Sequence, residues 1–275
     1  MAQIIKEIVK DLKDNLRSEK NIISLTLVGS FSNPKKTLEK FNDLDLVIIC
    51  NKLTIPFLSN LKKVTGRLEK DYSSFKIGIT SSFKIGPIKV PSKKKQTIMI
   101  HFLIYTKEGY KKYESALTRF SFQHYKTLLG WPLSKINSVS SVSIKDLFNK
   151  IDGIPAMKDW IIKKEIFYLE PTANGVKVIK NKIEGKLYSE VILYSVLRLA
   201  SNMLRTMKIY AETDLKMCKL FEKYFKMGSN KIPFEFCLYK KRLRGKGLFD
   251  KSEIKIIKEK SLNFIRECEN ILKKK

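Results

Sequence analysis

The amino-acid sequence predicts an α/β domain, with a short mixed sheet flanked by helices, followed by an all-helical domain. Up to about residue 135, apolar runs of strand length alternate with segments of helical periodicity, whereas the later patterns are mostly helical. A chain of 275 residues with 43% hydrophobic content can bury two modest cores. We therefore expect one domain over residues 1–135 and a second over residues 136–275.

The elements of the first domain follow from the spacing of apolar residues. Between residues 3 and 19 they recur every three or four positions, which is typical of an amphipathic helix packed on a sheet. The elements expected after it are strands at 25–28 and 43–49, a helix at 53–71, a hairpin built from the Phe-Lys-Ile-Gly runs at 75–78 and 83–86, a strand at 97–105, and helical segments to residue 129.

A break rich in glycine, proline and serine separates the two predicted domains. It begins at Gly130-Trp131-Pro132 and continues through the serines up to Ser143, so it indicates a linker. The helices expected beyond it lie at about 144–148, 157–169, 186–208, 213–226 and 253–272.

Two carboxylates interrupt the second apolar run. Asp43 and Asp45 are two residues apart on a predicted strand, so they project from one face while Leu44 and Leu46 point the other way. Two carboxylates on one face repel each other unless a cation lies between them. A hard divalent cation, Mg²⁺ or Mn²⁺, suits such a pair because it also accepts phosphate oxygens of a substrate.

A glycine and a serine follow the first apolar run. Gly29 has no Cβ, so the backbone there can approach a phosphate closely, and the hydroxyl and amide of Ser30 can donate to phosphate oxygens. Twelve residues then separate Ser30 from Asp43. This order predicts a phosphate-binding turn beside a metal-binding strand.

Residues 22–50 resemble the DNA polymerase β-like nucleotidyltransferase superfamily, in its two-domain form with a helical C-terminal domain. The matching residues are Gly29, Ser30, Asp43 and Asp45. The resemblance implies that the two aspartates hold the metals that bind a nucleoside triphosphate, and that the Gly-Ser turn grips its phosphates. The plainer interpretation, turn chemistry at Asn42-Asp43 with a solvated Asp45, does not explain why Asp45 interrupts an apolar run.

The superfamily usually adds a third carboxylate on a later strand, and this sequence departs from that pattern. No Asp or Glu occurs between Asp71 and Glu108, and the strand at 97–105 carries His101 where the acid would be expected. A neutral imidazole could accept a proton or ligate Mn²⁺ or Zn²⁺. The alternative is a histidine buried among apolar core residues.

A second candidate for the general base lies on the helix expected at 186–208. Glu190, Arg198 and Asn202 recur there at nearly helical spacing on a mostly apolar helix. Such a stripe is typical of a cleft wall, with Glu190 as the base and Arg198 and Asn202 for phosphate or substrate. The alternative is the solvated face of a surface helix.

The net charge suggests a polyanionic partner. The 55 Lys and Arg residues against 27 Asp and Glu give a formal charge of +28. Basic residues gather within 72–107, which includes Lys93-Lys94-Lys95, and within 240–246, near aromatic residues at 234, 236, 239 and 249. Dispersed cations beside rings that can stack on bases favour RNA, for example tRNA.

The four cysteines and the apolar runs restrict the setting in which we expect the protein. Cys50, Cys218, Cys237 and Cys268 show no C-x-x-C spacing, which fits reduced thiols in the cytoplasm. No apolar run approaches membrane-spanning length, and the first residues lack the apolar core of a signal peptide.

Three functions remain open at this stage. The favoured one is metal-dependent transfer of a nucleoside monophosphate from a nucleoside triphosphate to an RNA acceptor. The second is nucleotidyl transfer to a small-molecule or protein hydroxyl, with a base such as Glu190. The third, which the missing third carboxylate suggests, is a catalytically degenerate nucleic-acid-binding protein.

Overall fold

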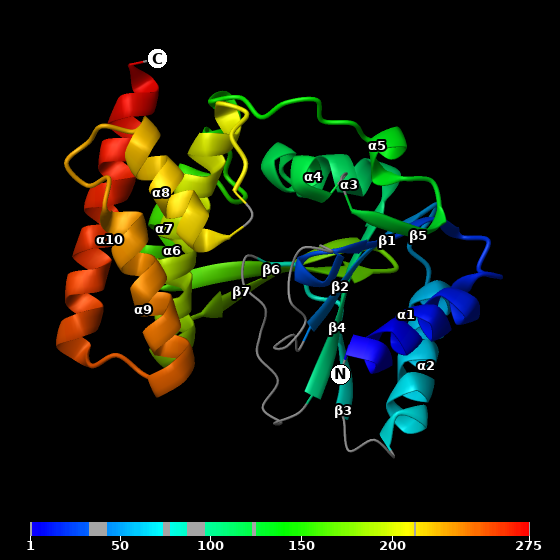
Figure 1. Cartoon of the computed structure of the whole chain (residues 1–275). Coiled ribbons are helices and arrows are strands. Elements are labelled where there is room, and N and C mark those ends of the chain that lie inside the picture. Colours follow the sequence, from blue (N-terminus) through cyan, green and yellow to red (C-terminus); the bar gives the residue numbers. More distant parts are fainter. Residues whose placement is uncertain are drawn as a thin grey trace. The chain divides into compact units, whose positions relative to one another are not determined.

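The computed structural model describes residues 2–32, 43–73, 78–86, 97–122, 125–211 and 213–274. The chain divides into two compact units (Figure 1). The first unit comprises residues 1–114, 118–139 and 168–179, and the second unit comprises residues 115–117, 140–167 and 180–275. The domain boundary after residue 135 stays a prediction.

The first unit is built on a five-stranded sheet with the strand order β3-β4-β2-β1-β5. Strand β1 pairs antiparallel with β2 and β5, whereas β4 pairs parallel with β2 and β3, so the sheet is mixed, as predicted. The strands are β1 (Ile22–Val28), β2 (Asp43–Cys50), β3 (Gly78–Ser82), β4 (Thr97–Thr106) and β5 (Lys126–Gly130).

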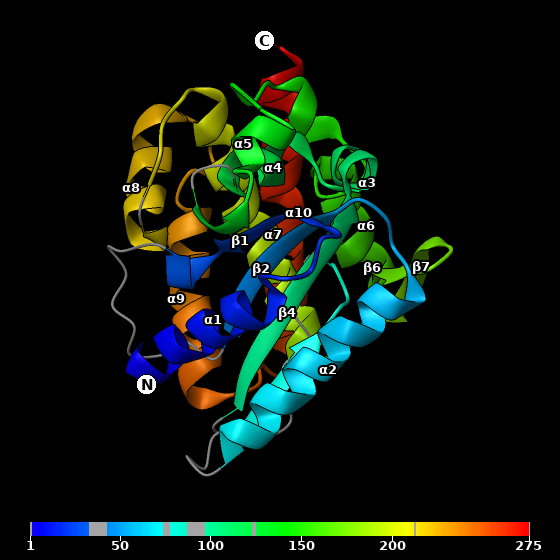
Figure 2. The same ribbon diagram turned by 90° about the vertical axis from the view of Figure 1, so that its right-hand side faces the viewer.

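Helices α1 (Ala2–Leu16) and α2 (Ile55–Asp71) lie side by side on one face of this sheet (Figure 2). Leu44, Leu46 and Ile48 point from β2 into the core that these helices close. The threonine hydroxyl of Thr54 accepts a hydrogen bond from the Phe57 amide, which caps the start of α2. These two helices confirm the predicted amphipathic segments.

The opposite face of the sheet carries the other set of alternate side chains. Val47 and Ile49 from β2 join Leu103 and Tyr105 from β4 in a second core. Helices α3 (Lys107–Tyr113) and α5 (Leu133–Ile136) contribute to it, and α4 (Ala116–Phe122) follows α3 in the chain. Asp43 and Asp45 belong to this second face, because they share the alternation of Val47 and Ile49.

Two expectations about the edges of the sheet are wrong. Residues 126–130 form strand β5 rather than the end of a helix, since they pair with β1. Gly130 has a φ of 69°, and a Cβ there would lie 2.0 Å from the Ile23 carbonyl oxygen. Residues 78–82 form β3, parallel to β4, rather than part of a hairpin, and residues 75–77 of the first Phe-Lys-Ile-Gly run lie outside the described ranges.

The second unit is mostly helical, as predicted. The central helix α7 buries most of its length and contacts α6, α8, α9 and α10. The elements are the 3₁₀ helix η3 (Lys145–Phe148), α6 (Ile154–Lys163), α7 (Gly185–Thr206), α8 (Asp214–Tyr224), α9 (Ile232–Lys246) and α10 (Lys251–Lys273). Asp250 and Glu253 form a capping box that starts α10.

A hairpin, helix α9 and the short helix α5, which lies within the predicted linker, were not predicted. The helix expected at 157–169 ends at Lys163, because Lys164 adopts a left-handed conformation with a φ of 52°. Strands β6 (Glu165–Thr172) and β7 (Gly175–Lys182) follow and pair with each other. Helix α9 was missed because its apolar, basic and aromatic residues alternate without a single strong apolar face.

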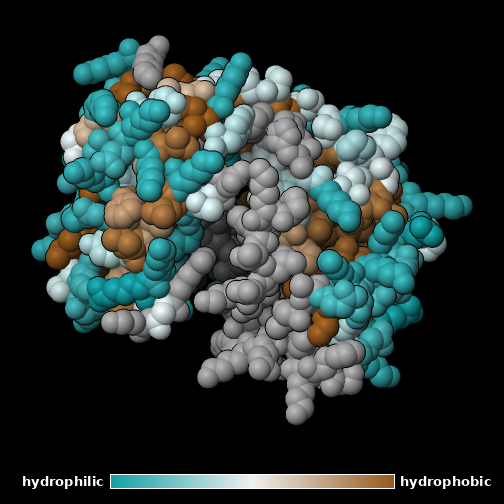
Figure 3. Space-filling view, viewed as in Figure 1, coloured by the Kyte–Doolittle hydropathy of each residue, from teal (hydrophilic) through white to brown (hydrophobic). Residues whose placement is uncertain are grey.

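The surface in Figure 3 is mainly hydrophilic, with hydrophobic residues scattered among charged ones. None of the helices within the described ranges is both long enough and apolar enough to cross a membrane.

Candidate active site

Asp43 and Asp45 lie at the start of strand β2. Their side chains are half-buried on the face opposite Leu44 and Leu46, which are fully buried. The sheet therefore presents two carboxylates from one strand end on one face, as the i, i+2 spacing predicts.

Gly29 directly follows β1 and lies beside Asp45. Val28 is the register partner of Asp45, and Gly29 has a φ of 78°. A Cβ at Gly29 would lie 2.3 Å from Oδ2 of Asp45, which is far inside van der Waals contact. The 3₁₀ helix η1 (Ser30–Ser32) follows, and the Ser32 hydroxyl donates to the Gly29 carbonyl at 2.9 Å. Only glycine fits this close approach.

His101 lies next to Asp45 on the neighbouring strand β4. Its Nδ1 is 3.1 Å from Oδ1 of Asp45, and its Nε2 is 2.6 Å from the Lys84 carbonyl oxygen. The ring is 4% exposed. We refer to Gly29, Asp43, Asp45 and His101 as the Asp45 cluster. Ser30 lies in η1, and its side chain is outside the described part of the chain.

Comparison with known proteins relates this arrangement to one fold. No protein-family model and no curated protein matches the sequence. Among solved structures, the chain is similar to spectinomycin adenyltransferase AAD(9) from Enterococcus faecialis, in a crystal structure with ATP and spectinomycin. The two chains share 11% sequence identity, with a TM-score of 0.52 over 95% of this chain and 99% of that chain.

This chain has a nucleotidyltransferase fold. The mixed sheet, the flanking helices and the helical C-terminal region are those that the resemblance of residues 22–50 implies. In this fold the Asp45 cluster lies on strands β1, β2 and β4, which are central in the sheet.

The donor set of the nucleotidyltransferase sheet fits a divalent cation bound together with a nucleotide. Within the described ranges no group of three or more His, Cys, Asp or Glu side chains is placed to hold a metal ion. Asp43 and Asp45 are two hard oxygen donors on one face, and Gly29 leaves room for Oδ2 of Asp45, which a Cβ there would approach to 2.3 Å. Mg²⁺ typically takes one or two carboxylates and completes its shell with water and substrate phosphates.

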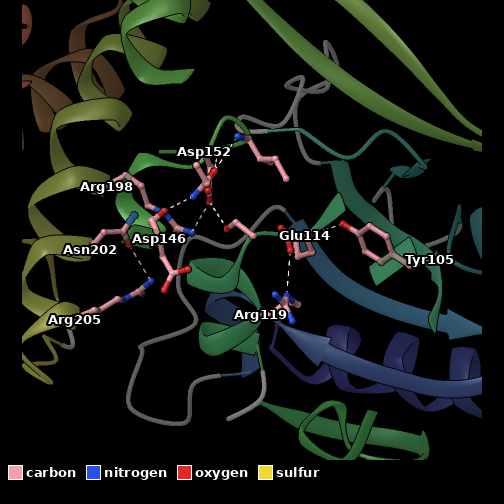
Figure 4. A network of polar contacts seen from close by, with 11 residues as sticks. Tyr105, Glu114, Arg119, Asp146, Asp152, Arg198, Asn202 and Arg205 are labelled. Atoms are coloured by element: carbon pink, nitrogen blue, oxygen red, sulfur yellow. Dashed lines mark hydrogen bonds and ion pairs between the residues drawn. The ribbon is translucent and has the colours of Figure 1, made fainter. Parts of the chain in front are cut away.

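The residues predicted on α7 lie in the second unit. Glu190 is half-buried. Arg198 pairs with Asp152, with 3.6 Å between Nη2 and Oδ2, and Asp152 also accepts a hydrogen bond of 2.8 Å from the Ser115 hydroxyl (Figure 4). We refer to Ser115, Asp152 and Arg198 as the Asp152 cluster. Its acid and its hydroxyl were missed, because Asp152-Gly153 has the pattern of an ordinary turn before a helix.

Asn202 lies one turn beyond Arg198 on α7. It is 1% exposed, and its Oδ1 accepts a hydrogen bond of 3.3 Å from Arg205. Its Nδ2 has no hydrogen-bond partner within the described part of the chain. The roles of Glu190, Arg198 and Asn202 toward a substrate stay predictions.

The predicted basic and aromatic cluster at residues 234–249 forms helix α9 and the start of the next turn. Phe236 and Phe249 are buried, and Tyr239 packs edge-on against both. Lys240 pairs with Asp214 at 2.7 Å, and Arg242 pairs with Glu253 at 2.6 Å. Phe236 and Phe249 therefore contribute to the helical core, whereas Phe234 is 40% exposed. Lys93-Lys94-Lys95 lies outside the described ranges.

A cavity of about 460 Å³ lies at the opposite end of β2 and β4 from Asp43 and Asp45. Its walls include the loop 51–54, Thr106, Tyr113 and Val176. None of the predicted site residues lines this cavity.

Proposed function

We propose that the protein is a metal-dependent nucleotidyltransferase that moves a nucleoside monophosphate from a nucleoside triphosphate to a hydroxyl of a small molecule and releases pyrophosphate. The observation that carries the proposal is the placement of Asp43 and Asp45 on one face of β2, with Asp45 directly beside the Gly29 turn. The nucleotidyltransferase fold supports the same reaction class. The neighbour with ATP and spectinomycin supports a small-molecule acceptor.

Each residue of the sheet has a role in this proposal. Asp43 and Asp45 would hold Mg²⁺ or Mn²⁺. When bound, such a metal stabilises the charge that develops on the leaving pyrophosphate. We expect the backbone of the Gly29 turn to contact the triphosphate, and glycine at this position leaves room for Oδ2 of Asp45, which a Cβ would approach to 2.3 Å. Ser30 donates to the phosphates at the same turn.

The acceptor hydroxyl needs a group that removes its proton. Glu190 remains our candidate for this base, since it is a half-buried carboxylate on the central helix of the second unit. Asn202 remains a candidate for a contact with the substrate, whereas the ion pair of Arg198 with Asp152 favours a structural role for that predicted substrate contact.

RNA is the second candidate acceptor, and the formal charge of +28 is the observation that favours it. Lysines and arginines that neutralise phosphates give binding that weakens steeply with salt. Two of the four rings predicted to stack on bases, Phe236 and Phe249, are buried, which weakens that candidate, so we place it after the small-molecule acceptor.

A transfer assay tests the proposal. Each α-labelled nucleoside triphosphate, with Mg²⁺ or Mn²⁺, is incubated with a pool of polyhydroxylated small molecules or with total tRNA. The comparison is wild type against Asp43→Asn/Asp45→Asn. Label in a small-molecule product with wild type only is the expected result, and label in tRNA only would select the second candidate. No transfer from any nucleotide, with tRNA still retained on a filter, would support the degenerate binding protein.

A further inference from the structure

The position beside Asp45 on the neighbouring strand is occupied by His101. Strands β2 and β4 are parallel and in register, so Asp45 and His101 project from the same face. No Asp or Glu occurs between residues 72 and 107, a range that contains both β3 and β4. Neither of these two strands therefore adds a carboxylate to the face that carries Asp43 and Asp45.

Both ring nitrogens of His101 have an oxygen partner within hydrogen-bond distance. The Lys84 carbonyl can only accept, so the Nε2 atom, 2.6 Å away, carries a hydrogen. Nδ1 lies 3.1 Å from Oδ1 of Asp45, which is within hydrogen-bond distance of that carboxylate oxygen. The ring thus connects Asp45 to the backbone at residue 84, and it is engaged at both nitrogens that could ligate a metal.

The two oxygens of Asp45 have different surroundings. Oδ1 contacts His101, whereas Oδ2 faces Gly29 so closely that a Cβ there would lie 2.3 Å away. The Asp45 side chain is 13% exposed. The carboxylate is held in orientation from both sides, with Oδ2 toward the turn that we expect to contact the triphosphate.

We propose that His101 is a positioning residue that orients Asp45 for a single divalent cation, the one that binds with the nucleoside triphosphate. The inference rests on the proposed function. Two cations in one site need several bridging carboxylate oxygens, whereas strands β2, β3 and β4 contribute two carboxylates to this face, and an imidazole engages Asp45. Two carboxylates, together with water and phosphate oxygens, are sufficient ligands for one hard cation.

Equilibrium dialysis tests this by counting the Mn²⁺ and the nucleotide bound per chain, with saturating α,β-methylene-ATP. We expect one Mn²⁺ per nucleotide for wild type and two for His101→Asp, which places a carboxylate beside Asp45. Ser81→Asp is the matched control, because Ser81 is exposed and is the register partner of Ile100 on the same sheet. It should bind one Mn²⁺.

His101→Asn keeps the proposal testable if the aspartate variant does not fold. It should bind one Mn²⁺ with an affinity about tenfold or more below that of wild type, as is common when a group that orients a ligand is changed. Unchanged affinity, two Mn²⁺ in wild type, or one in a folded His101→Asp would overturn the inference and leave the proposed function standing. Absence of any nucleotide-dependent Mn²⁺ in wild type would instead overturn both.

Discussion

The Asp45 cluster of the first unit and the Asp152 cluster of the second unit each join a carboxylate to a nitrogen-bearing side chain. Asp45 contacts His101 through one oxygen, while its other oxygen faces the Gly29 turn. Asp152 contacts the Arg198 guanidinium and the Ser115 hydroxyl through the same oxygen, Oδ2. Asp45 thus presents an oxygen to a turn without a side chain, whereas Asp152 connects elements of the helical unit.

The comparison shows that the spacing of a charged residue in the sequence does not by itself reveal its role. Arg198 has the spacing of a phosphate ligand on α7, yet the structure gives it a carboxylate partner that is only 12% exposed. Removing one partner of a nearly buried ion pair strongly destabilises a fold, because the other charge is left without compensation. We therefore expect substitutions in the Asp45 cluster to affect nucleotide transfer, and those in the Asp152 cluster to affect stability. Substitutions in the two clusters test this contrast, and Glu269, outside both clusters, provides a comparison.

Loss of either carboxylate on β2 should have the largest effect. Asp43→Asn or Asp45→Asn should lower the transfer rate by roughly 10³-fold, because a metal contributes several kcal/mol to stabilising the transition state. The melting temperature should stay near that of wild type. Asp14→Asn, on the exposed side of α1, is the control. A transfer rate within a factor of about five of wild type in both variants would contradict the site, since one tenfold change is about 1.4 kcal/mol.

A methyl group at Gly29 should come next. Gly29→Ala places a Cβ 2.3 Å from Oδ2 of Asp45 and forces alanine to a φ of 78°. We expect the transfer rate to fall by roughly 10–100-fold, because small displacements of a reacting group slow the reaction strongly. The free energy of unfolding should fall by about 1 kcal/mol, because alanine is disfavoured in a left-handed conformation. Gly66→Ala is the matched control, since no atom lies within 4 Å of a Cβ there. Equal activity of the two variants would show that the Gly29 turn takes no part in catalysis.

Removal of the Asp152 charge should act on stability. Asp152→Asn removes the carboxylate that pairs with the Arg198 guanidinium, whose side chain is 19% exposed, so the free energy of unfolding should fall by about 2–3 kcal/mol. Urea unfolding followed by circular dichroism measures this change. Asp159→Asn removes an exposed carboxylate paired with Lys163 and should cost under about 1 kcal/mol. Equal losses for the two variants would argue against a special role of the Asp152 cluster.

The smallest effect concerns Glu269 on α10, which pairs with Lys158 of α6 and Lys273 of α10. The hydrogen bond from Lys158 holds the pKa of this carboxyl below its ordinary value, with a further contribution from Lys273. A lowered pKa in the folded state stabilises the fold above the unfolded-state pKa, and this stabilisation is lost as the pH falls through the folded-state value.

Glu269→Gln should therefore lower the free energy of unfolding by under about 1 kcal/mol at pH 7. The difference in free energy of unfolding between variant and wild type should shrink as the pH falls through the lowered pKa of the folded state, because Glu269 then becomes protonated in both the folded and the unfolded protein. Glu259→Gln, on the exposed side of α10, provides the baseline. A difference from wild type that grows as the pH falls would have the wrong sign for this account.

Several features of the sheet could be predicted because they depend on residues close in sequence. The alternation around Asp43 and Asp45 determines which face they occupy, and Gly29 after an apolar strand indicates a turn. The spacing of apolar residues in α1 and α2 likewise predicts which face of each helix is buried. These local signals were sufficient for the fold class.

Other features depend on partners distant in the chain. The short strands β3 and β5 are defined by pairing with β4 and β1, and their sequences alone do not distinguish strand from helix or turn. The partners of His101 and Arg198 are likewise distant, a carbonyl at residue 84 and the carboxylate of Asp152. No spacing rule predicts contacts of that kind.

The most direct test of the contrast between the two clusters measures two quantities on the same two variants. Asp45→Asn and Asp152→Asn are titrated calorimetrically with α,β-methylene-ATP in Mg²⁺, and their melting temperatures are recorded. The account predicts that Asp45→Asn loses metal-dependent nucleotide binding at a nearly unchanged melting temperature. It predicts that Asp152→Asn binds the nucleotide normally and melts several degrees lower. Loss of binding in Asp152→Asn with an unchanged melting temperature would contradict the account and identify Arg198 and its partner as part of the nucleotide site.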